Sequence, residues 1–104
     1  MQTPALQSLE GQEVTQATKI HDYVQIAFGE DVGLSIYNDI TLEPDMDISD
    51  LLRRRVESVR QTDGNIELQF SGGVILRIDL HPQASYGPEV LELNRKGFPS
   101  VVWS

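Results

Sequence analysis

Seven carboxylate side chains lie between residues 30 and 50, and they are the residues of this chain best suited to chemistry. No basic residue separates them. They are Glu30, Asp31, Asp39, Glu43, Asp45, Asp47 and Asp50. Clustered carboxylates can bind a metal ion, transfer protons or attract a basic partner, and each role requires a different arrangement.

The spacing of Asp45, Asp47 and Ser49 matches the first oxygen ligands of a calcium-binding loop. Such a loop also needs glycine at its sixth position and glutamate at its twelfth. Here those positions hold Asp50 and Val56. We therefore exclude an EF-hand and predict that the protein uses no metal ion or other cofactor.

The adjacent pair Glu30 and Asp31 is the best candidate for proton transfer, but it lies on a predicted hairpin turn. A carboxyl group open to water is a poor general acid or base. The chain has no cysteine, and no serine has a histidine or lysine at a spacing typical of a nucleophile–base site. Ser71, Gly72 and Gly73 lie between predicted strands and form a turn, not a phosphate-binding loop. These patterns predict a protein that is not an enzyme.

Attraction of a basic partner is the role that the charge distribution favours. The net charge is −8, and the first 50 residues hold ten acidic residues and one basic residue. Such a surface repels nucleic-acid phosphates and attracts basic proteins. We predict that the seven carboxylates bind a protein partner, with no direct nucleic-acid binding. The run of basic residues at 53–55 either neutralises these acids within the chain or forms an opposite patch.

The histidines support an alternative function of a different class. His21 and His81 can meet only if the two halves of the chain pack together, and Tyr86 follows His81 closely. A pocket with these three residues at its mouth would indicate a small-ligand or metal-binding sensor or enzyme subunit.

A repeated stretch predicts the elements that position these residues. Residues 24–36 align without a gap on residues 66–78 when the sequence is shifted by 42 positions. In both copies apolar residues alternate with others on either side of a glycine-containing turn, which is typical of a β-hairpin. We predict a mainly β fold, with α+β as the alternative and at most one or two short helices, one of them near residues 48–53. Two similar antiparallel β-meander units, at about 9–38 and 51–80, would form a sandwich or half-open barrel.

The alternating pattern also predicts the core. Its members share the inward-facing positions of the two units: Val14, Val24, Ile26, Phe28, Leu34, Ile36, Val56, Val59, Ile66, Leu68, Phe70, Leu76 and Ile78. Strands are predicted within residues 12–20 and at residues 56–61, with helices over 12–20 and 51–60 as the competing interpretation. Residues 1–8 are expected to be a loose lead-in.

The C-terminal extension, 81–104, is predicted to hold two more strands. Residues 90–93 are apolar enough for an edge strand, and the last strand ends at Trp103, which we expect to dock on the core. An exposed edge at 91–93 would allow a structural homodimer, in which Glu92→Pro should abolish pairing. The oligomeric state stays open at this point.

Length and composition predict a single domain spanning 1–104. No apolar run approaches the roughly 20 residues of a membrane span. The first nine residues lack the basic and apolar segments of a signal peptide. We expect a cytoplasmic protein that has no membrane partner.

Three segments carry a resemblance to known proteins: residues 32–38, residues 86–93 and residues 101–103. They resemble small bacterial β-rich proteins, some of which are similar to immunity proteins that neutralise contact-dependent or polymorphic toxins. The resemblance carries over no functional residues. It implies a compact protein that binds a toxin, for example a nuclease, and occludes its active or substrate-binding surface. An acidic protein suits that role, because nucleases are commonly basic where they bind nucleic acid.

Overall fold

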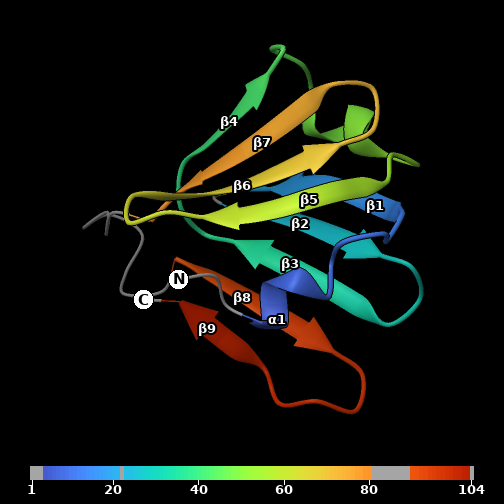
Figure 1. Ribbon diagram of the computed structural model, residues 1–104, viewed down its shortest axis with the longest axis vertical. Coiled ribbons are helices and arrows are strands. Elements are labelled where there is room, and N and C mark those ends of the chain that lie inside the picture. Colours follow the sequence, from blue (N-terminus) through green and yellow to red (C-terminus); the bar gives the residue numbers. More distant parts are fainter. Residues whose placement is uncertain (1–3, 22, 81–89, 104) are drawn as a thin grey trace.

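Nine β-strands form two antiparallel sheets in the computed structural model, which describes residues 4–21, 23–80 and 90–103 (Figure 1). The first sheet has the order β1-β2-β3-β8-β9, with bounds Val14–Ile20, Tyr23–Phe28, Val32–Ile36, Leu91–Arg95 and Val101–Trp103. The second has the order β4-β7-β6-β5, with bounds Ile40–Glu43, Val74–Asp79, Asn65–Phe70 and Val56–Gln61. The predicted mainly β fold is confirmed, and the helical alternatives for residues 12–20 and 51–60 are wrong.

The two meander units pair in the same register. Val14 lies opposite Phe28 in the first unit, and Val56 lies opposite Phe70 in the second, 42 positions later. A bulge follows Val14 in β1, and another follows Val56 at the same place in β5. The structural correspondence therefore extends beyond the hairpins to the irregular strand that precedes each of them.

The units exchange hydrogen bonds reciprocally where β1 and β5 begin. The N–H of Gly11 donates to the carbonyl of Val56, and the N–H of Arg53 donates to the carbonyl of Val14, both at 2.8 Å. Each donor and each acceptor of one bond lies 42 positions from its counterpart in the other. The two units are thus related by an approximate two-fold axis, as the subunits of a symmetric dimer are.

An isolated antiparallel bridge between Glu13 and Arg55 lies between these two hydrogen bonds and joins the two sheets at one corner. Beyond this corner β1 and β5 do not pair with each other, because β1 is an edge strand of the first sheet and β5 is an edge strand of the second. The result is a sandwich closed at one corner, in agreement with the half-open arrangement that the sequence predicts.

The strand after each unit crosses to the sheet of the other unit. β4 follows the first unit and pairs with β7, so that Ile40 lies opposite Ile78. β8 follows the second unit and pairs with β3, so that Leu91 lies opposite Ile36. Because Ile36 and Ile78 are equivalent, β4 and β8 are equivalent strands. The strand predicted at residues 90–93 is present as β8, but β8 also pairs with β9 on its other side, so the prediction that it is an edge strand is wrong.

All thirteen residues predicted for the core are buried. Trp103 packs against the core, as predicted. The expectation of a loose lead-in at residues 1–8 is wrong for residues 4–8, because the short helix α1, Pro4–Gln7, places Leu6 in the core with 1% exposure. Residues 1–3 lie outside the described residues. The 3-10 helix η1, Ile48–Leu51, lies where a short helix was predicted. None of the helices in the described ranges is long and apolar enough to cross a membrane.

Candidate functional site

A cleft of about 890 Å³ opens between β1 of the first sheet and β4 of the second. Residues 17–19 of β1 and residues 40–42 of β4 line it on two sides. The connection from β4 to η1 contributes residues 45–49. These two strands are edges of their sheets, so the cleft lies where the sandwich remains open.

Apolar side chains form much of the cleft wall. Ile36 is fully buried at its base, whereas Ile40, Leu42, Met46 and Ile48 are half-buried and pack against the core. On the other side of the molecule α1 packs beside β5, and Leu6 is buried there. Leu6 is the counterpart of Ile48 in the repeat. Because Leu6 is buried and Ile48 is only half-buried, the cleft side of the molecule is less completely filled.

Exposed charges of mostly one sign surround this apolar wall. Asp39, Asp45 and Asp47 line the cleft and are exposed. Lys19 is the basic residue among the lining residues, and it is also exposed. Three carboxylates against one ammonium group favour a basic occupant over an acidic one.

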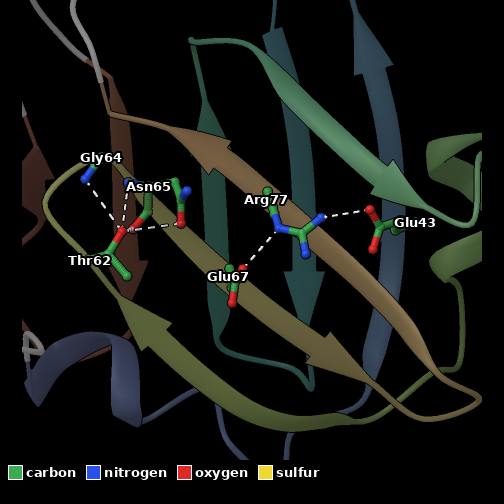
Figure 2. Close-up of polar contacts among 6 residues, drawn as sticks. All are labelled: Glu43, Thr62, Gly64, Asn65, Glu67 and Arg77. Carbon is green, nitrogen blue, oxygen red and sulfur yellow. Dashed lines mark hydrogen bonds and ion pairs between the residues drawn. The ribbon is translucent and has the colours of Figure 1, made fainter.

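Glu43 belongs to the same run in the sequence, but its carboxylate has a partner on the second sheet (Figure 2). Arg77 Nη1 donates to Glu43 Oε1 at 3.0 Å, and Arg77 Nε donates to Glu67 Oε1 at 2.9 Å. The pKa of Arg77 is raised by the hydrogen bond to Glu67 and then by Glu43. One arginine thus links β4, β7 and β6, and Glu43 is engaged there.

Glu30 and Asp31 lie at the opposite end of β3 from Asp39. Together with Arg95 and Lys96 they line a separate hollow of about 370 Å³. Asp50 is exposed on η1 and is absent from the lining of the main cleft. Of the seven carboxylates predicted as one patch, the structure therefore brings three together at the cleft.

Two arginines of the basic run at 53–55 donate side-chain hydrogen bonds to backbone carbonyl groups. Arg54 donates to the carbonyls of Asp50 and Ser71, both at 3.0 Å, and Arg55 Nη1 donates to the carbonyl of Gly11 at 2.6 Å. The side-chain ion pairs among the described residues both involve Arg77. The basic run thus holds the corner where β1 and β5 meet, and it forms no ion pair with the predicted acidic patch.

The structure describes one of the three residues of the predicted histidine pocket. His21 is exposed in the turn after β1 and is not among the residues lining the cleft. His81 and Tyr86 lie outside the described residues. Within the described ranges, no three histidine, aspartate or glutamate side chains are grouped to hold a metal ion.

Sequence reasoning missed Tyr23 and Asn38, which both line the cleft. The Tyr23 ring lies 5.5 Å from the Tyr37 ring, between centroids, and Asn38 Nδ2 donates to the carbonyl of Asp79 at 2.8 Å. A comparison of the two copies could have found them, because their counterparts in the second unit are Asn65 and Leu80. The copies differ in chemical class at these positions.

The cleft combines apolar walls, an acidic rim and the outer edges of two strands. These features suit recognition of a basic polypeptide, which offers apolar side chains, positive charge and backbone groups at once. Comparison with protein-family models, curated proteins and solved structures finds no match for this chain.

Proposed function

We propose that this protein is a non-enzymatic binding module that recognises a basic protein partner at the cleft between β1 and β4. The observation that carries the proposal is the acidic rim of Asp39, Asp45 and Asp47 around an apolar wall. Apolar contacts would supply affinity, and the carboxylates would select for positive charge and speed association.

The most concrete form of this function is that of an immunity protein, which would bind a toxin in the cytoplasm and occlude its active or substrate-binding surface. The resemblance of residues 32–38, 86–93 and 101–103 to such proteins supports it. The net charge of −8 also supports it, because a basic nuclease surface is complementary to an acidic inhibitor.

A small-ligand site is the second candidate function, and the size of the same cleft favours it. A volume of about 890 Å³ is within the range of small-molecule pockets. A homodimer paired through residues 91–93 loses its basis, because β8 is paired on both sides in the first sheet.

Affinity capture of the tagged protein from its own cells tests the function, at about 0.1 M and about 0.5 M salt. We expect one stoichiometric basic protein, whose capture weakens at the higher salt because exposed charge pairs are screened. Absence of a protein partner at both salt levels would contradict the proposal and direct attention to small ligands.

Two triple variants locate the binding surface in the same experiment. The first changes Asp39, Asp45 and Asp47 to asparagine, and it should lose the salt-sensitive part of the capture. The matched control changes three exposed acids away from the cleft: Glu30→Gln, Asp31→Asn and Glu57→Gln. Equal losses in the two variants would mean that overall charge, and not the cleft, attracts the partner.

A further inference from the structure

The outer edge of β4 lacks the strand that its equivalent carries. β4 and β8 are related by the approximate two-fold axis, and β8 pairs with β9 on its outer edge (Figure 1). In the part of the chain that the structure describes, no strand pairs with the outer edge of β4. The second sheet therefore has four strands where the first has five.

The hydrogen-bonding pattern identifies which backbone groups face this edge. The N–H of Asp79 donates to the carbonyl of Asp39, so residues 39 and 79 are a hydrogen-bonded pair. Hydrogen-bonded and non-hydrogen-bonded pairs alternate along an antiparallel ladder. The N–H and C=O groups of Ile40 and Leu42 therefore point away from β7, towards the open edge.

The equivalent groups on β8 show what such an edge accepts. Leu91 and Leu93 occupy the positions on β8 that Ile40 and Leu42 occupy on β4, and they lie opposite Trp103 and Val101 of β9. Those two side chains pack against the core, while Val102 between them is 46% exposed.

We propose that an extended basic segment of the partner adds to β4 as a fifth strand of the second sheet, in the place that β9 holds in the first. This inference rests on the proposed binding function and specifies its mode. Main-chain hydrogen bonds to Ile40 and Leu42 would give affinity, and alternate side chains would give specificity.

The cleft determines the chemistry of the segment. Apolar side chains at every second position would enter the cleft as Val101 and Trp103 enter the core, because Ile40 and Leu42 line both the edge and the cleft. Lysine or arginine nearby would meet the carboxylates of the rim. A second copy of this chain, with a net charge of −8, would instead add like charge to that rim.

The other edges are less suited to accept a strand. The bulges after Val14 and Val56 distort β1 and β5, and bulges discourage edge pairing. Both strands are also engaged at the corner formed by Glu13 and Arg55. β9 is three residues long, which makes it a short edge.

A synthetic peptide in which lysines alternate with valine and tryptophan serves as the probe, with a control peptide that carries glutamate in place of lysine. NMR titration and amide hydrogen exchange on the full chain report where the peptide binds. We expect the lysine peptide to slow exchange of the Ile40 and Leu42 amides, while the glutamate peptide does not bind.

Two substitutions at one position separate the backbone contact from the side chain. Leu42→Pro removes the outward N–H and keeps every bond to β7, whereas Leu42→Ala shortens the side chain and keeps the N–H. We expect Leu42→Pro to weaken peptide binding at least about tenfold more than Leu42→Ala does, through loss of a backbone hydrogen bond and a clash of the ring with the added strand. Circular dichroism establishes that both variants are folded.

The remaining outcomes overturn either the inference or the binding function on which it rests. Equal weakening by both substitutions, protection of other amides, or no binding of the lysine peptide would exclude strand addition at β4. Tighter binding of the glutamate peptide, or a dimer that Leu42→Pro dissociates, would exclude the basic occupant. A captured basic partner that binds both variants equally would refute strand addition and leave the binding function intact. If no partner were captured but the lysine peptide still paired with β4, the proposed function would be refuted and the strand-accepting edge would be supported.

Discussion

Gly11 and Arg53 stand 42 positions apart and share a left-handed backbone, with φ angles of 86° and 71°. Both N–H groups donate across the approximate two-fold axis, to Val56 and Val14. The geometry that joins the two units therefore requires a positive φ on each side. Glycine adopts it freely, but for a residue with a Cβ it costs roughly 1–2 kcal/mol.

Arg53→Gly should for this reason stabilise the protein. We expect the free energy of unfolding to rise by about 0.5–1 kcal/mol, because the greater entropy of glycine in the unfolded chain offsets part of the relieved strain. Urea denaturation measures it. Arg60→Gly, within strand β5, is the control and should lower stability by about 0.5–1 kcal/mol. A loss of stability in Arg53→Gly would contradict the assignment of strain.

Leu9 and Leu51 are a second equivalent pair, and both side chains are fully buried. Leu9→Ala and Leu51→Ala should each lower the free energy of unfolding by about 2–5 kcal/mol, because each leaves a cavity in the shared core. Leu52→Ala is the control, since Leu52 is 48% exposed, and it should change stability by no more than about 0.5 kcal/mol. Chemical denaturation of the three variants checks this, and a small effect at Leu9 alone would mean that the N-terminal segment packs weakly.

Arg77 bridges three strands through Glu43 and Glu67, and Arg77→Met should weaken that link (Figure 2). All three side chains are partly exposed, so we expect the thermal midpoint to fall by no more than a few degrees. The difference from the parent protein should shrink when salt screens the ion pairs. Arg60→Met, on β5 beyond β6, is the matched control, because the side-chain ion pairs among the described residues both involve Arg77. A salt-independent loss would show that the aliphatic part of Arg77 matters more than its charge.

The repeat made the hairpins and the core predictable, because alternation fixes which side chains face inward once the turns are placed. It did not predict that β4 and β8 exchange sheets, since a short apolar segment such as 40–42 carries no signal for its partner strand. The helix around Leu6 was missed for a related reason, because four residues fold there through tertiary packing and not through propensity.

The acidic patch illustrates the limits of sequence proximity. Asp31 and Asp39 are eight positions apart, but a strand between them places them at opposite ends of the sheet. Glu43 and Asp45 are two positions apart, yet Glu43 is bound to Arg77 and Asp45 lines the cleft. Asp39 follows the end of β3, and Asp45 and Asp47 lie in the connection from β4 to η1. Both segments line the cleft, so these three of the seven carboxylates come together there.

The contrast between β8 and β4 gives the last prediction. Tyr37 N–H donates to the Val90 carbonyl, so Ser35 and Glu92 are the next hydrogen-bonded pair along the ladder. Glu92→Pro removes an N–H inside the sheet and leaves the buried Ser35 with an unpaired carbonyl, which costs roughly 1–3 kcal/mol. Thermal unfolding should show a large loss of stability for Glu92→Pro and a small one for the control Glu92→Ala. At Leu42, the proline and alanine variants should be equally stable. If proline at Glu92 lowered the stability as little as proline at Leu42, β8 would have to be an edge strand in solution. The contrast between β8, paired on both sides, and β4, open on one side, would then be wrong.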